Sequence, residues 1–179
     1  MMKTFSVPDS SQVSEESKLV FSQFAQSGGK IPNLYATIGY SGNALTSYMA
    51  YSRQQAKGTF HNRDREAIFL IVSQLNGCQY CLASHTQSAI KAGWKEEDTL
   101  LLRAGTYPEK KWELIYGIIR SAIEQKGEVS DALQEGFFAL GYKEAALIDL
   151  FVLINVMSFT NYVYRLTKIP IDFPEAKEI

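Results

Sequence analysis

Residues 62–94, NRDREAIFLIVSQLNGCQYCLASHTQSAIKAGW, decide the fold of this chain because they contain two apolar segments on either side of an Asn-Gly pair. Within each segment the apolar residues recur at three- and four-residue spacing, which predicts two α-helices. Asn62 is a suitable N-cap for the first helix, which should end near Leu75. A second helix should begin at Cys78 and stop at Gly93, where the chain can turn left-handed. The segment therefore predicts a helical hairpin.

The rest of the chain shows the same helical spacing, and no run alternates with a sustained two-residue period. The sequence is therefore that of an all-α protein built from helical hairpins. Besides the hairpin, the predicted helices cover 14–26, a short stretch starting at Pro32, 43–57, 96–103, 109–125, 130–140 and 144–166. A chain of 179 residues fits a single domain, 1–179, with one hydrophobic core.

Composition excludes several classes of partner. The 18 Lys and Arg against 19 Asp and Glu give a net charge of -1, which provides no basic surface for nucleic acid or for an anionic membrane. Residues 67–84 carry no formal charge, but polar residues interrupt them too often for a membrane span, so we expect two buried helices. The first residues lack the features of a secretory signal, and we expect a cytoplasmic protein. In that reducing compartment, two cysteines suggest chemistry rather than scaffolding.

Both cysteines and one of the two histidines lie within GCQYCLASH, residues 77–85. A helix that begins at Cys78 places both thiols in its first turn, where free N–H groups and the helix dipole favour the thiolate. The three-residue step to Cys81 keeps both sulfurs on one helix face and close enough to bridge. His85 lies on the same face one turn later. The two thiols and the imidazole are therefore expected to line up.

Glu66 completes this constellation if the two helices fold back at the Asn-Gly pair, because it then lies beside His85. The carboxylate would orient and charge the imidazole, and His85 would take or return the proton of Cys81. Cys78 would then resolve oxidised Cys81 as a disulfide. The four residues form a candidate catalytic site for thiol chemistry.

Three other interpretations fit parts of this pattern. Two cysteines, a histidine and a glutamate could bind zinc, but a structural zinc site usually pairs two such knuckles and this chain has one. Covalent haem attachment requires a histidine directly after the second cysteine, where the chain has Leu82. The cysteines could also be small buried hydrophobic residues beside a hydrogen-bonded core histidine. The joint spacing of the four residues favours the thiol site, with no metal and no bound cofactor.

The order Glu66, Cys78, Cys81, His85 resembles the signature of the AhpD-like alkylhydroperoxidases, which are members of the carboxymuconolactone decarboxylase superfamily. The flanking sequences IPNLYATIGYSGNAL, AIKAGW and TNYVYRLTKIPIDFP are similar to its single-motif, peroxidase-related branch. The resemblance covers most of the chain. It implies an AhpD-like helical bundle with its catalytic core at about 30–125, and a homo-oligomer, often a trimer or a hexamer.

The resemblance also implies a reaction. Cys81 attacks the peroxide and becomes a sulfenic acid, Cys78 closes the disulfide, and Glu66 and His85 manage the protons. We therefore expect a thiol-dependent peroxidase that reduces organic hydroperoxides or hydrogen peroxide with electrons from a thiol or lipoyl-type reductant. The alternative is a redox-sensing or interaction protein whose cysteine pair changes assembly without turnover. Decarboxylases of the superfamily lack the cysteine pair, so that activity is not expected.

Tyr80 departs from the family pattern, because the peroxidases of the group place a second histidine just before the second cysteine. A phenol with a pKa of ~10 is a poor base at neutral pH, although it can donate a hydrogen bond. Four other polar residues are left outside the site. His61 is expected in an exposed loop, Asn155 and Asn161 in structural hydrogen bonds, and Arg165 as a helix-end cation.

Overall fold

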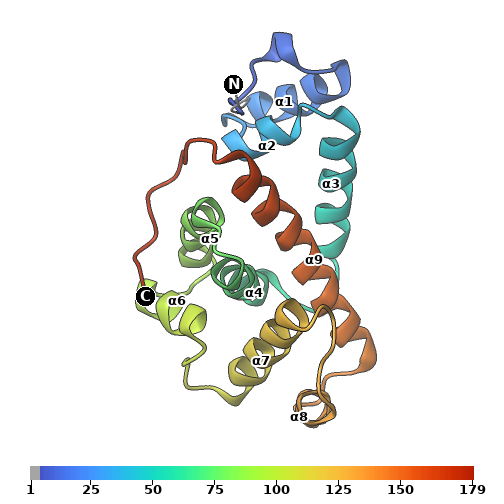
Figure 1. The fold of residues 1–179 in the computed structure, drawn as a ribbon, viewed down its shortest axis with the longest axis vertical. Helices are drawn as coiled ribbons and strands as arrows, with labels where there is room; N and C mark the ends of the chain where they lie inside the picture. The colour runs from blue at the N-terminus through green and yellow to red at the C-terminus, as the bar shows by residue number, and fades with distance from the viewer. Residues whose placement is uncertain (1–4) are drawn as a thin grey trace.

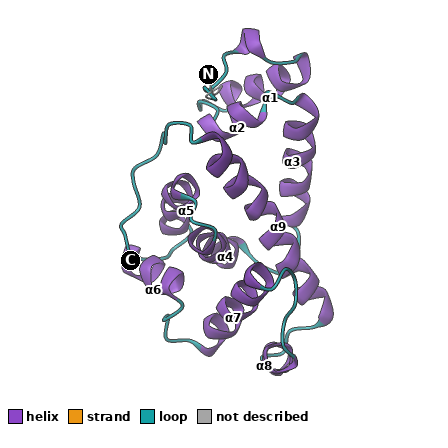
Figure 2. Ribbon diagram, in the orientation of Figure 1, coloured by secondary structure: helices purple, strands orange, loops and turns teal. Residues whose placement is uncertain are grey.

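Nine α-helices and one short 3₁₀ helix follow one another in the computed structural model, which describes residues 5–179, and no strand occurs in that part of the chain (Figures 1 and 2). The prediction of an all-α protein is confirmed. The elements are η1 (Ser10–Gln12), α1 (Glu15–Gln26), α2 (Asn33–Ile38), α3 (Gly42–Gln55), α4 (Asn62–Leu75), α5 (Gln79–Lys91), α6 (Glu96–Ala104), α7 (Lys110–Glu124), α8 (Asp131–Ala139) and α9 (Glu144–Thr167).

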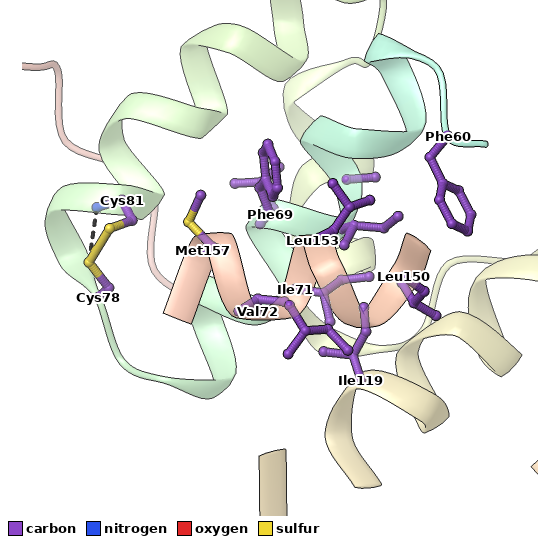
Figure 3. Close-up of a cluster of buried hydrophobic side chains, with 14 of the residues drawn as sticks. Phe60, Phe69, Ile71, Val72, Cys78, Cys81, Ile119, Leu150, Leu153 and Met157 are labelled. Atoms are coloured by element: carbon purple, nitrogen blue, oxygen red, sulfur yellow. Dashed lines mark hydrogen bonds between the residues drawn. A yellow bond between two sulfur atoms is a disulfide. The ribbon is translucent and has the colours of Figure 1, made fainter. Parts of the chain in front are cut away.

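Helix α4 lies at the centre of the bundle and packs against α5, α6, α7 and α9 (Figure 1). Six consecutive residues of α4, Ala67–Val72, are all buried, because apolar side chains cover every side of this segment. Figure 3 shows Ile71 and Val72 of α4 against Leu153 and Met157 of α9. Burying each such aliphatic side chain contributes roughly 1.5–3 kcal/mol. The core therefore fixes α4, and α4 carries the first residue of the candidate site.

The hinge between α4 and α5 is held by a left-handed residue. Gly77 has φ +65°, and the N–H of Cys78 donates to the carbonyl of Ser73 at 2.9 Å, which closes the last turn of α4. Arg165 of α9 donates from Nη1 to the carbonyl of Asn76 at 2.5 Å. Arg165 lies in the last turn of α9, as predicted for a helix-end cation, and its guanidinium also anchors the hinge to α9.

Two helices begin one residue away from the predicted start, α4 one residue earlier and α5 one residue later. His61, not Asn62, is the N-cap of α4, because the side-chain carbonyl of Asn62 accepts from Arg65 Nη2 at 3.0 Å and Asn62 becomes the first helical residue. Cys78 is likewise the N-cap of α5 rather than its first residue. The predicted stop of α5 is confirmed, since Gly93 has φ +96°.

Helix α9 is the longest element and the most apolar. By length and composition alone it could cross a membrane, with mean hydropathy 1.6 in its most apolar window, of which 44% is buried in this chain. That is weak evidence for a span, because a core helix of a soluble protein has the same composition, and α9 packs against α2, α3, α4 and α5. After α9 the C-terminal tail, residues 168–179, returns past α5 to α6 (Figure 1).

Candidate functional site

The two cysteines lie at the start of α5, next to the hinge. They are joined as a disulfide, with their Cα atoms 5.3 Å apart (Figure 3). The N–H of Cys81 donates to Sγ of Cys78 at 3.2 Å, so the N-cap sulfur satisfies one of the free donors of the first turn. Cys78 is fully buried and Cys81 is 3% exposed. The pair is therefore in bonding geometry and shielded from bulk solvent.

Glu66 and His85 meet across the hairpin, as its symmetry predicts. Nδ1 of His85 lies 2.7 Å from Oε2 of Glu66, and the two side chains are only 19% and 11% exposed. The imidazole is packed edge-on against Phe69, with ring centroids 5.0 Å apart. A carboxylate bonded to Nδ1 fixes the orientation of the ring and leaves Nε2 free for proton transfer. The catalytic roles of these residues stay predictions.

A small cavity connects the disulfide to the histidine. It has a volume of about 40 Å³, and Cys81 and His85 both line it. A single water needs roughly 10–15 Å³ on this measure, so the cavity holds a group of two or three small atoms. Tyr35 and Tyr48 form another part of its wall. Cys81 is therefore in contact with a space large enough for a very small group.

Tyr80 does not act as a base at this site. Its hydroxyl donates to Oδ1 of Asp172 in the C-terminal tail at 2.5 Å and accepts from the N–H of Leu34 at 3.2 Å. Burial, followed by the hydrogen bond to Asp172, raises the pKa of Tyr80 far above its ordinary value. The phenol therefore stays protonated and ties α5 to the tail and to α2.

The residues of the zinc interpretation do not come together as a ligand set. Within residues 5–179 no group of three or more His, Cys, Asp and Glu side chains is placed to hold a metal ion. The two cysteine sulfurs are bonded to each other, and the carboxylate of Glu66 is hydrogen-bonded to His85.

The residues left outside the site are where their chemistry suggests. His61 is exposed, and Asn155 is exposed and donates to the carbonyl of Phe151 at 2.9 Å. Asn161 is fully buried, accepts from Nδ2 of Asn76 at 3.0 Å and donates to Oγ of Ser73 at 3.3 Å. These bonds fasten the hinge to α9, so the structural interpretation of Asn161 is confirmed.

Sequence reasoning missed the two tyrosines that wall the cavity. Tyr35 on α2 and Tyr48 on α3 have ring centroids 5.6 Å apart, and burial raises the pKa of both phenols. The sequence contains only a weak sign that these tyrosines lie at the site, because both belong to ordinary amphipathic helices. Their position at the site depends on packing between helices that are distant in sequence.

Part of the chain matches a known protein family. Residues 41–114, which contain all four candidate site residues, match the model of the carboxymuconolactone decarboxylase family. No curated protein sequence matches the chain.

Several solved structures share the fold. An uncharacterized peroxidase-related protein from Ralstonia eutropha JMP134, described as an alkylhydroperoxidase AhpD core, superimposes with a TM-score of 0.83 at 15% identity, over 96% of this chain and 93% of that one. A peroxidase-related protein from Silicibacter sp. TM1040 gives 0.77 at 18% identity, over 94% and 89%. The debrominase Bmp8 in complex with 2,3,4-tribromopyrrole gives 0.76 at 16% identity, over 96% and 93%.

Identities this low establish a common fold, while the family model identifies the segment that carries the site. Residues 41–114 match the carboxymuconolactone decarboxylase family model, and the chain has the fold of these AhpD-like structures.

Proposed function

We propose that this protein is a thiol-dependent peroxidase of antioxidant type. The observation that carries the proposal is the cavity of about 40 Å³ lined by Cys81, which is bonded to Cys78, and by His85, which is bonded to Glu66. A thiolate, a positioned base and room for two oxygen atoms are what peroxide reduction requires.

The reaction balances with these residues. In the reduced protein the thiolate of Cys81 attacks one peroxide oxygen, the O–O bond breaks, and His85 supplies the proton that releases an alcohol or water. Cys81 is left as a sulfenic acid. The thiolate of Cys78 then attacks that sulfur, the disulfide forms, and hydroxide leaves as water after protonation. A dithiol or lipoyl-type reductant restores both thiols by exchange.

Bmp8, a debrominase, shares the fold, and a dithiol could also supply the two electrons of a reductive debromination. The small volume of the inner cavity supports peroxide reduction rather than debromination. A volume of about 40 Å³ admits a peroxide group but not a brominated ring. We therefore favour the peroxide.

The test counts thiols. Reduced protein is mixed with hydrogen peroxide or tert-butyl hydroperoxide, and free thiols are measured against time in the wild type and in Cys81→Ser. The wild type should lose both of its thiols, while Cys78 in the variant should react at the rate of an ordinary buried thiol. Equal rates in the two proteins would refute the peroxidase proposal.

The second candidate is a redox switch without turnover, and the position of the disulfide favours it. Cys78 caps α5 directly after a hinge that is anchored to α9, so oxidation could reposition helices. A steady-state assay with an excess of dithiothreitol and hydroperoxide distinguishes the two candidates. Peroxide consumed far beyond one equivalent indicates an enzyme, whereas a single equivalent with a change in assembly indicates a switch.

A further inference from the structure

A second, larger cavity adjoins the small one. It has a volume of about 340 Å³ and lies where the last turn of α3 meets the first turn of α4 and the middle of α5. The two cavities share four wall residues: Tyr35, Tyr48, Ser84 and His85. The large cavity is therefore an outer chamber that leads past His85 to the inner cavity at Cys81.

Arg65 gives the outer chamber a fixed cation. Its Nη1 donates to the carbonyl of Ala56 at 3.2 Å and its Nη2 to Oδ1 of Asn62 at 3.0 Å, which hold the guanidinium in place. Its third nitrogen, Nε, is buried, and the N–H of Nε has no hydrogen-bond partner among residues 5–179. A buried donor of a charged group without an acceptor is costly, by about 1–3 kcal/mol or more. The chamber therefore lacks an acceptor that a ligand would supply.

Gln55 faces the same chamber from the end of α3. Its Oε1 is also buried without a partner in the described part of the chain. A half-turn of the terminal amide exchanges this oxygen for Nε2, which donates. Arg65 and Gln55 together can offer N–H donors from two directions, as a carboxylate with two oxygens requires.

The side chains that line the chamber also give it a net positive charge. Arg53 and Arg65 line it as cations, and the one anion in its wall, Glu66, is already bonded to His85. Phe69 and Val156 supply an apolar part of the wall. The lining suits a small molecule that has a carboxylate at one end and an apolar body.

We propose that the outer chamber binds the carboxylate of the substrate, so that the preferred peroxides are small organic hydroperoxides that carry a carboxylate. This inference rests on the proposed peroxidase function and specifies its substrate class. The peroxide group enters the inner cavity, the apolar body passes Tyr35 and Tyr48, and the carboxylate accepts from Arg65 and Gln55. The volume of about 340 Å³ limits the size of the molecule that the chamber can hold.

The experiment compares peroxides that differ only in charge. The probes are hydrogen peroxide, tert-butyl hydroperoxide bearing a carboxymethyl group on one methyl, and the methyl ester of that compound. Second-order rates of thiol loss are measured by stopped flow on the reduced full-length protein. We expect the carboxylate to react roughly tenfold faster than its ester, as a hydrogen bond to a charged group implies.

Two matched variants test the assignment to the chamber. Gln55→Glu places a like charge beside the bound carboxylate and should bring the ratio of acid to ester to about one or below. Gln54→Glu makes the same change at the exposed neighbouring residue, which does not line the chamber, and should keep the wild-type ratio. Circular dichroism melting of both variants verifies that they fold.

The outcomes separate this inference from the proposed function. If hydrogen peroxide oxidises the thiols but acid and ester react equally, or if Gln55→Glu keeps the preference, the chamber assignment is wrong and the peroxidase stands. If no peroxide reacts, both are wrong. The disulfide is also reduced with mercaptopropionate and with its methyl ester. A charge preference found only in that reaction would assign the chamber to the reductant and overturn its assignment to the peroxide.

Discussion

Tyr80 directly precedes Cys81, the predicted reactive cysteine, but its role in the fold is structural. The sequence indicates only that a phenol is a poor base there, and it contains no sign of Asp172, which lies 92 residues away. The contact arises because the C-terminal tail returns past α5 after α9 has ended. A long-range pair of this kind follows from the whole path of the chain, not from local spacing.

Removing that hydroxyl should loosen the tail. In Tyr80→Phe the carboxylate of Asp172 keeps only the N–H of Asn33, 3.0 Å from its Oδ2, and loses the phenol. We expect the free energy of unfolding to fall by about 1–3 kcal/mol, as for a hydrogen bond to a charged group. Urea unfolding measures the loss, and Tyr107→Phe, in the loop between α6 and α7, is the control.

The pH dependence of this loss follows from the raised pKa of Tyr80. The folded state stabilises the protonated phenol, so the contribution is complete below the unfolded pKa of ~10 and declines only as the pH rises above it. The difference in stability between the wild type and Tyr80→Phe should therefore be constant from about pH 6 to 9 and shrink above about 10. A difference that vanished near neutral pH would contradict the role assigned to Tyr80.

Glu66 is the residue whose substitution best isolates proton transfer. Glu66→Gln keeps the shape of the side chain but removes the charge that orients and supports the imidazole of His85. We expect thiol oxidation at pH 7 to slow by roughly 100-fold, the lower part of the range for general acid–base catalysis. The thermal midpoint should change little. A loss of stability as large as the loss of rate would instead indicate a structural pair.

The elements of the hairpin explain why its site could be anticipated from the sequence. The Asn-Gly pair fixes the fold-back point, the helical repeat fixes which residues share a face, and Glu66 and His85 then meet. The same reasoning could not identify Tyr35 and Tyr48 as residues near the site, since no residue close to them in the sequence indicates that they lie beside α5. It identified Arg165 as a helix-end cation but not its bond to the hinge, because the acceptor is a backbone carbonyl 89 residues away.

The hinge itself is open to test. In Gly77→Ala the new Cβ would require a left-handed alanine and lie 3.0 Å from Nη1 of Arg165. We expect a loss of about 1–2 kcal/mol in the free energy of unfolding from the backbone alone, and slower thiol oxidation because the start of α5 shifts. Gly93→Ala is the control, since φ is also positive there but a Cβ has no neighbour within 4 Å. If both variants oxidised at the wild-type rate, the hinge would not position the cysteines.

At the scale of the whole molecule, α9 leaves an apolar stripe uncovered. Ile148, Phe159, Tyr162 and Leu166 are 66%, 39%, 58% and 71% exposed. With Val152 and Asn155 between Ile148 and Phe159, the stripe has alternating steps of four and three residues, the heptad spacing of helix–helix seams. A helix that is apolar on all sides is normally buried.

No charge interrupts this stripe. The two charged residues of α9 beyond its first turn are used within the chain: Asp149 accepts from the N–H of Thr59 at 2.7 Å, and Arg165 binds the hinge. Tyr51 of α3, 43% exposed, extends the surface, and a groove lined by Tyr48, Tyr51 and Phe159 lies between α3 and α9. Since an aromatic side chain offers about 150–250 Å², these residues provide roughly half of the ~800 Å² that each subunit buries in a stable interface.

We propose that a second copy of this chain covers the stripe, so that the protein is a homo-oligomer assembled through α9. Leu166→Glu would bury an unpaired carboxylate at that contact and should dissociate the oligomer at micromolar concentration. Sedimentation velocity measures the mass of the wild type and of the variant. Leu101→Glu, at a leucine of α6 that is 39% exposed and lies outside the stripe, is the matched control and should keep the wild-type mass. A monomeric wild type, or an oligomer that withstands Leu166→Glu, would show that something other than a second copy covers α9.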